Sequence, residues 1–71
     1  MILREKIRKA QLYNTALFDD LHCYIVYDDI GMHHFSTNLD ELMDKYGDET
    51  PKWIYVTKSL IDEKFLVEIW L

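Results

Sequence analysis

The sequence has 71 residues, a formal net charge of −5 and a single cysteine, and these values exclude several classes of protein. A chain of this length forms one domain, residues 1–71, and buries only roughly 60% of the surface that it exposes when unfolded. Because Cys23 is alone, no internal disulfide can reinforce so small a core. Self-association or a bound metal are the remaining ways in which natural proteins of this size gain stability.

The first six residues, MILREK, become charged at once, so we expect no signal peptide. No stretch approaches the roughly 20 apolar residues that cross a bilayer. A lone thiol fits a reducing compartment. We therefore expect a cytoplasmic protein without a membrane partner.

Charge is distributed unevenly along the chain. Residues 1–12 carry +3 by formal count and the remaining residues carry −8. The acidic majority should repel nucleic acid, so we do not expect a nucleic-acid partner. Only the N-terminal segment offers a basic surface for phosphate or an anionic surface, through Arg4, Lys6, Arg8 and Lys9, and ordinary solvated charge is the alternative interpretation.

An amphipathic stripe predicts a helix over residues 2–19. Its members follow spacings of four and three residues, namely Leu3, Ile7, Ala10, Asn14, Leu17 and Leu21. Asn14 is polar within this stripe, so it is either a hydrogen-bonded core residue or a break between two short helices at residues 13–15.

Residues 21–27 are rich in β-branched and aromatic side chains and predict a strand, and residues 28–31 have turn chemistry. Residues 32–35 then form the second, shorter strand of a hairpin. A four-residue turn would place His33 opposite Val26 and His34 opposite Ile25.

A second helix is predicted after residues 36–38. Asn38 can cap its N-terminus and Glu41 can reach back in a capping box. Gly47 is expected to take the left-handed conformation after its C-terminus. Its apolar face has helical spacing, through Leu39, Leu42, Met43 and Tyr46.

Residues 53–56 and 65–71 predict two more strands, which follow a loop at 48–51 and are joined by a connection at 59–64. The sequence thus predicts an α+β fold: a four-stranded, mainly antiparallel sheet with two helices, in the order α-β-β-α-β-β. The first helix should cover one face, and the second should close an edge or lie on the same face.

The C-terminal strands are apolar on both faces, which is unusual in so small a chain. The first helix can cover the face that bears Phe65, Val67, Ile69 and Leu71. The other face, which includes Glu68, then needs a partner. Its large amphipathic and apolar side chains are typical of interface cores, and the candidate interface residues are Tyr24, Trp53, Tyr55, Leu66 and Trp70. The leading hypothesis is a non-enzymatic binding protein that self-associates, as a homodimer, through sheet surface.

One cluster has the residue types of a metal site, namely His22, Cys23, His33 and His34, and the predicted hairpin keeps its members apart. We therefore expect no metal site, unless a symmetric dimer completes one. Cys23 should be a small buried hydrophobic residue, because no nearby base is placed to activate it. No catalytic motif or phosphate-binding glycine loop is present, so neither enzymatic activity nor a cofactor is expected.

Ten of the thirteen acidic residues occur as neighbouring pairs. Four pairs lie at predicted ends or turns: Asp19 and Asp20, Asp28 and Asp29, Asp48 and Glu49, Asp62 and Glu63. Solvation and local turn chemistry are the simple explanation. The alternative hypothesis is an acidic inhibitor that mimics nucleic acid and docks on a basic nucleic-acid-binding protein. The segment LDELMDKYGD at residues 39–48, in a short acidic chain, resembles small accessory proteins of bacteriophages and mobile elements, and this resemblance implies a binding or inhibitory role.

Overall fold

The computed structural model describes residues 1–31 and 33–71 and confirms the predicted α+β class. Met32, which was expected to start the second strand, lies outside the described residues. The elements in chain order are α1 (Leu3–Tyr13), α2 (Thr15–Asp19), β1 (Leu21–Tyr27), β2 (His33–Ser36), α3 (Leu39–Tyr46), β3 (Trp53–Lys58) and β4 (Phe65–Trp70).

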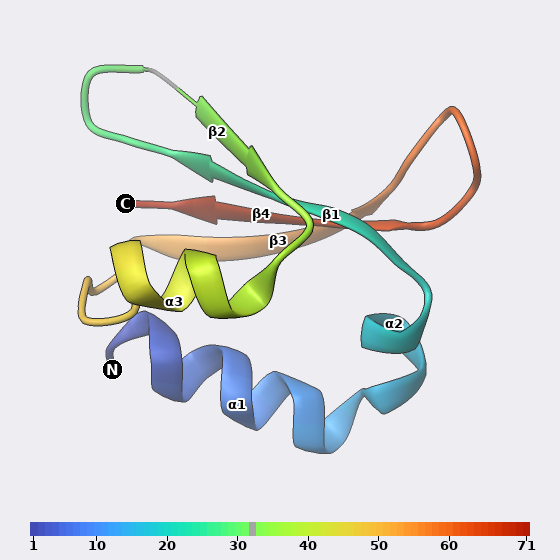
Figure 1. Cartoon of the computed structure of the whole chain (residues 1–71), viewed down its shortest axis with the longest axis horizontal. Helices are drawn as coiled ribbons and strands as arrows, with labels where there is room; N and C mark the ends of the chain where they lie inside the picture. The colour runs from blue at the N-terminus through green and yellow to red at the C-terminus, as the bar shows by residue number, and fades with distance from the viewer. Residues whose placement is uncertain (32) are drawn as a thin grey trace.

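The strands form one sheet in the order β2-β1-β4-β3 (Figure 1). β1 pairs antiparallel with β2, and β3 pairs antiparallel with β4, as expected for two hairpins. The two central strands, β1 and β4, run parallel, so the sheet is mixed, and the prediction of a mainly antiparallel sheet agrees with two of its three strand pairs. The chain crosses from the first hairpin to the second through α3, and this crossover places β4 beside β1.

The predicted N-terminal helix is two helices, so the chain has three helices in its described part and not two. Asn14 breaks the stripe with φ −145° and ψ 54°, and its carbonyl oxygen accepts hydrogen bonds from the N–H groups of Leu17 and Phe18. Asparagine favours such breaks because its side chain competes with the helical backbone. The alternative of a break at residues 13–15 is therefore the correct one.

The start of α1 is held by the end of α3 instead of by a capping side chain. The first N–H groups of a helix have no partner within it. Here the N–H of Leu3 donates to the carbonyl oxygen of Glu49 at 2.8 Å, and that of Arg4 donates to Gly47 at 3.0 Å. The Arg4 guanidinium also contacts the Asp48 carboxylate. These bonds join the two helices side by side.

The caps of α3 agree with the sequence at one end only. The Asn38 side chain accepts a hydrogen bond from the N–H of Glu41 at 3.2 Å, as predicted. Gly47, in contrast, is right-handed with φ −57° and ψ −30°, so the predicted left-handed cap is wrong. A Cβ at this position would lie 2.4 Å from the carbonyl oxygen of Met43 and 2.6 Å from the Arg4 guanidinium. Glycine is therefore needed at this position because it lets the Met43 carbonyl and the Arg4 side chain approach closely, and not because of a left-handed backbone.

All three helices lie on the same side of the sheet and build one core against it (Figure 1). The buried core residues are Leu3, Ile7, Leu17, Tyr24, Val26, Leu42, Val67 and Ile69. As predicted, the face of β4 that carries Val67 and Ile69 is covered by α1. Within the described residues, no helix is long and apolar enough to span a membrane.

The register of the β1–β2 hairpin differs by one residue from the expectation. His33 pairs with Tyr27 and His34 with Val26. Because neighbouring residues point to opposite faces, a one-residue shift exchanges the faces of both histidines. His34 therefore lies on the helix side, where its ring approaches Tyr46, and His33 lies on the other side.

Candidate functional site

The face of the sheet that points away from the helices, called the open face below, is the most distinctive surface of the described chain. Side chains alternate along a strand, so the open face follows from the positions of the core residues and the strand register. It comprises Cys23, Ile25, Tyr27, His33, Phe35, Trp53, Tyr55, Thr57, Leu66, Glu68 and Trp70.

Six rings of the open face form a continuous aromatic band across all four strands. In order from β2 to β3 the band consists of Phe35, His33, Tyr27, Trp70, Trp53 and Tyr55, with successive ring centroids 5.0, 5.8, 4.1, 6.4 and 6.3 Å apart. The register explains this continuity, because Tyr27 is opposite His33 on one side and Trp70 on the other, while Trp53 is opposite Trp70.

The band covers part of the sheet but remains accessible at both ends. Phe35 is 64% exposed at one end, and Trp53 and Tyr55 are 47% and 52% exposed at the other. Cys23 and Ile25 on the same face are buried. Burial is the main cause that raises the pKa of the Cys23 thiol, and the charge of Asp62 adds to it. This thiol is therefore a poor nucleophile, in line with the role predicted for it.

Glu68 lies in the centre of the open face, on β4, opposite Ile25 and Tyr55. Desolvation raises the pKa of the Tyr27 hydroxyl, and hydrogen bonding with Glu68 and the negative charge of Glu68 raise it further. The indole N–H of Trp70 is buried and has no acceptor among the described residues. The Glu68 carboxylate, the Tyr27 hydroxyl and the Trp70 indole N–H are thus polar groups placed within a largely aromatic and aliphatic surface.

Four of the five predicted interface residues lie on the open face: Trp53, Tyr55, Leu66 and Trp70. Tyr24 does not, because its side chain points toward the helices and is only 3% exposed in the core. Tyr27, His33 and Phe35 also lie on the open face, but they were not among the predicted interface residues. Tyr27 lies three residues from Tyr24 and therefore on the opposite face of β1, and this alternation was the signal that distinguishes them.

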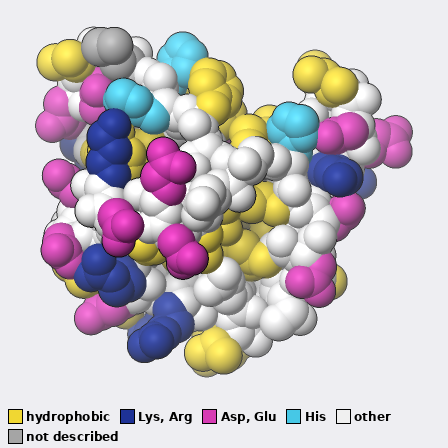
Figure 2. All heavy atoms as spheres, viewed as in Figure 1, with side chains coloured by type: hydrophobic (Ala, Val, Ile, Leu, Met, Phe, Trp, Pro, Cys, Tyr) yellow, Lys and Arg dark blue, Asp and Glu magenta, His cyan; other side chains and the backbone are white. Residues whose placement is uncertain are grey.

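The acidic pairs are distributed around the molecule and do not form one surface. Asp48 pairs with Arg4, and the Asp29 carboxylate lies 3.2 Å from the Lys52 ammonium. Asp28 lies 3.8 Å from the His34 ring. On the face shown in Figure 2, acidic side chains alternate with lysine and arginine side chains. The other predicted members, Asp19, Asp20, Glu49 and Glu63, are exposed.

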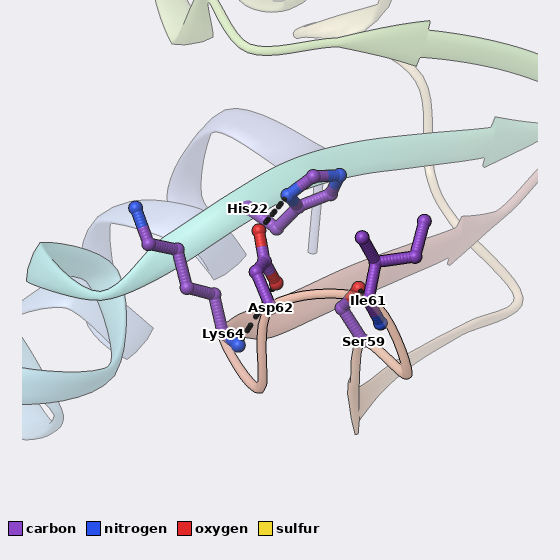
Figure 3. Close-up of polar contacts among 5 residues, drawn as sticks. All are labelled: His22, Ser59, Ile61, Asp62 and Lys64. Atoms are coloured by element: carbon purple, nitrogen blue, oxygen red, sulfur yellow. Dashed lines mark hydrogen bonds and ion pairs between the residues drawn. The ribbon is translucent and has the colours of Figure 1, made fainter.

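The β3–β4 connection is fixed by hydrogen bonds (Figure 3). The Ser59 hydroxyl accepts from the N–H of Ile61, and the Asp62 carboxylate accepts from the N–H of Lys64 and contacts His22 Nδ1 at 2.5 Å. Desolvation by itself raises the pKa of Asp62, but the bonds from Lys64, His22 and Ser59 and the charge of His22 outweigh it, so the pKa is lowered.

The structure does not bring together the three histidines and the cysteine that the sequence analysis considered as metal ligands. His22 contacts Asp62, His34 lies beside Tyr46, and Cys23 and His33 are on the open face. Cys23 had been expected to share its face with His34, and the corrected register gives it His33 as a face neighbour instead. Among residues 1–31 and 33–71, no three histidine, cysteine or carboxylate side chains are grouped as a metal site would need.

No protein-family model matches the chain, and neither a curated protein nor a solved structure matches it. The function proposed below therefore rests on the geometry of the open face.

Proposed function

We propose that this protein is a non-enzymatic interaction module that forms a homodimer through the open face of its sheet. The observation that carries the proposal is the aromatic band, which crosses all four strands on the face that no helix covers. Tyrosine and tryptophan are enriched at the centres of protein interfaces because they bury a large area at a small cost in side-chain entropy.

A second copy is the partner that the proposal names, because the isolated chain has a small core. The buried residues of its core cluster lie between one sheet face and three short helices. Two sheets that pack face to face are about 10 Å apart, close enough for the side chains of both open faces to interdigitate. Such a dimer would give the chain a second hydrophobic layer, which is how many domains below about 80 residues gain stability.

The absence of an enzymatic role is part of this proposal. Cys23 is buried, which raises the pKa of its thiol, and the charge of the Asp62 carboxylate raises this pKa further. His22, the histidine next to Cys23 in sequence, is already in contact with Asp62. A lone buried thiol also suits work in the reducing cytoplasm.

The acidic-inhibitor alternative has less support. Asp29, Asp48 and Asp62 already contact cationic or histidine side chains of the same chain. A mimic of nucleic acid would instead present its carboxylates together and unpaired to a basic groove. Capture of a basic host protein that is lost at high salt, by a wild-type chain that stays monomeric, would favour this alternative.

Sedimentation velocity on two tyrosine variants tests the proposal. Tyr55→Lys places a charge in the aromatic band and should shift the protein to monomer. Tyr13→Lys is the matched control, because Tyr13 is 89% exposed on α1 and lies away from the open face. Equal dimer content in both variants, with folding confirmed by circular dichroism, would contradict an interface on the open face.

A further inference from the structure

The open face carries two side chains that can hold opposite charges near neutral pH, His33 on β2 and Glu68 on β4. The face has no lysine or arginine. Its remaining ionisable groups are the Cys23 thiol and the hydroxyls of Tyr27 and Tyr55. Any partner that covers this face must therefore accommodate one carboxylate and one imidazole.

Within one chain these two side chains are not paired. β1 lies between their strands, and Glu68 is two residues along β4 from Trp70, which is in the same row as Tyr27 and His33. Strand spacings of about 4.8 Å and a rise of about 3.3 Å per residue put their Cα atoms roughly 12 Å apart. In the described part of the chain neither side chain takes part in an ion pair.

The distance between His33 and Glu68 within one chain becomes unfavourable when a partner covers the open face, because neither side chain can then balance the charge of the other. A carboxylate that is covered without a cationic or hydrogen-bonding partner loses its hydration, and this loss weakens association. Among the described residues Glu68 interacts with the Tyr27 hydroxyl, a neutral group that cannot offset the charge of the carboxylate. The surface of a second copy must supply what is missing.

A two-fold symmetric dimer can supply a partner for Glu68 at two equivalent contacts. In such an interface, if residue i of one copy contacts residue j of the other, then j of the first also contacts i of the second. We propose that His33 of each copy pairs with Glu68 of the other across the dimer interface. The imidazole N–H donates to the carboxylate, and the contact becomes an ion pair when the imidazole is protonated. This inference rests on the proposed homodimer and specifies its orientation.

The pairing also fixes the centre of the interface. The two-fold axis passes midway between His33 and Glu68, and this point lies over β1, beside Tyr27. The stack of Tyr27 on Trp70 is then central, where hot-spot residues concentrate. Trp53 and Tyr55, on the outer strand β3, lie farther from this axis but still within the contacting face.

A charge exchange across the interface tests this pairing. His33→Glu places two carboxylates together at each contact and should raise the dimer dissociation constant at least tenfold. Adding Glu68→Lys to the same chain restores opposite charges, so the double variant should return to within about threefold of the wild-type constant. As a matched control, Glu41→Lys with Lys45→Glu exchanges two exposed charges on α3 and should leave the constant unchanged.

The outcomes separate this inference from the proposed function. A wild-type dimer that His33→Glu leaves intact overturns the pairing but not the dimer. A dimer that His33→Glu dissociates and the double variant fails to restore also overturns the pairing, provided that circular dichroism shows both variants folded. A wild-type chain that remains a monomer at all concentrations contradicts the proposed function itself, and the pairing with it.

Discussion

The indole ring of Trp70 stacks on the phenol ring of Tyr27, with centroids 4.1 Å apart and planes inclined by 13°. The two residues are opposite each other on β1 and β4, which run parallel. A contact between residues 43 positions apart thus links the first hairpin to the second on the open face, just as Val26 and Ile69 do within the core.

Loss of this stack should cost stability. We expect Trp70→Ala to lower the free energy of unfolding by about 2 kcal/mol, because it removes a half-buried ring together with a ring–ring contact. Trp70→Phe keeps a stacking ring and removes the indole N–H that lacks an acceptor, so its cost should stay below about 1 kcal/mol. Urea unfolding at equal protein concentration measures both values, and equal losses would show that the stack contributes little.

Substitution of Gly47 should be destabilising although its backbone is right-handed. In Gly47→Ala the new methyl group meets a backbone carbonyl that cannot move easily, and we expect a loss of about 1–3 kcal/mol. Gly31→Ala is a useful comparison, because Gly31 has φ +83° and open space around it, so only the left-handed strain of about 1–2 kcal/mol applies. Unchanged thermal stability of Gly47→Ala would show that α1 and α3 separate at no cost.

The contact between His22 and Asp62 should make the β3–β4 connection sensitive to acid. The pKa of Asp62 is lowered on folding, so its stabilising contribution is present above the pKa of the unfolded state and is lost as pH falls through the folded value, below about pH 4. NMR titration should find its midpoint below that of an ordinary aspartate. In His22→Gln the midpoint should rise, and an unchanged midpoint would assign the shift to the hydrogen bonds from the Lys64 N–H and the Ser59 hydroxyl.

The Cys23 thiol should react slowly in the folded protein. Burial and the Asp62 carboxylate both disfavour the thiolate, which is the reactive form. We expect labelling by a thiol reagent at pH 8 to be at least 100-fold slower than in urea. A cysteine at the exposed position 15, Thr15→Cys in a Cys23→Ala background, should label rapidly under both conditions. Equally fast labelling of Cys23 would show that the sheet opens readily at β1.

Local features of the fold were accessible from the sequence. The stripe from Leu3 to Leu17, the possible break at Asn14 and the cap at Asn38 depend on residues within a few positions of one another, where propensity and spacing decide. The pairing of β4 with β1 does not depend on neighbouring residues, because no local pattern determines which strand of each hairpin lies at the centre of the sheet.

The register and the site show the same limit. The connection between Tyr27 and His33 is one residue longer than the predicted four-residue turn. This single residue is enough to exchange the faces of His33 and His34. Tyr24 and Tyr27 have the same chemistry, and only their alternation relative to the core separates a buried residue from a member of the aromatic band. Gly47 was misjudged because the close approach of Arg4 comes from a distant part of the chain.

The most direct test of the account is the mass of the wild-type protein in solution. Light scattering coupled to size exclusion, over a range that reaches high micromolar concentration, should give about 17 kDa, twice the 8.6 kDa of one chain. The mass should fall toward one chain on dilution as the open faces separate. A constant mass of one chain throughout this range would contradict the proposal that the open face is a homodimer interface.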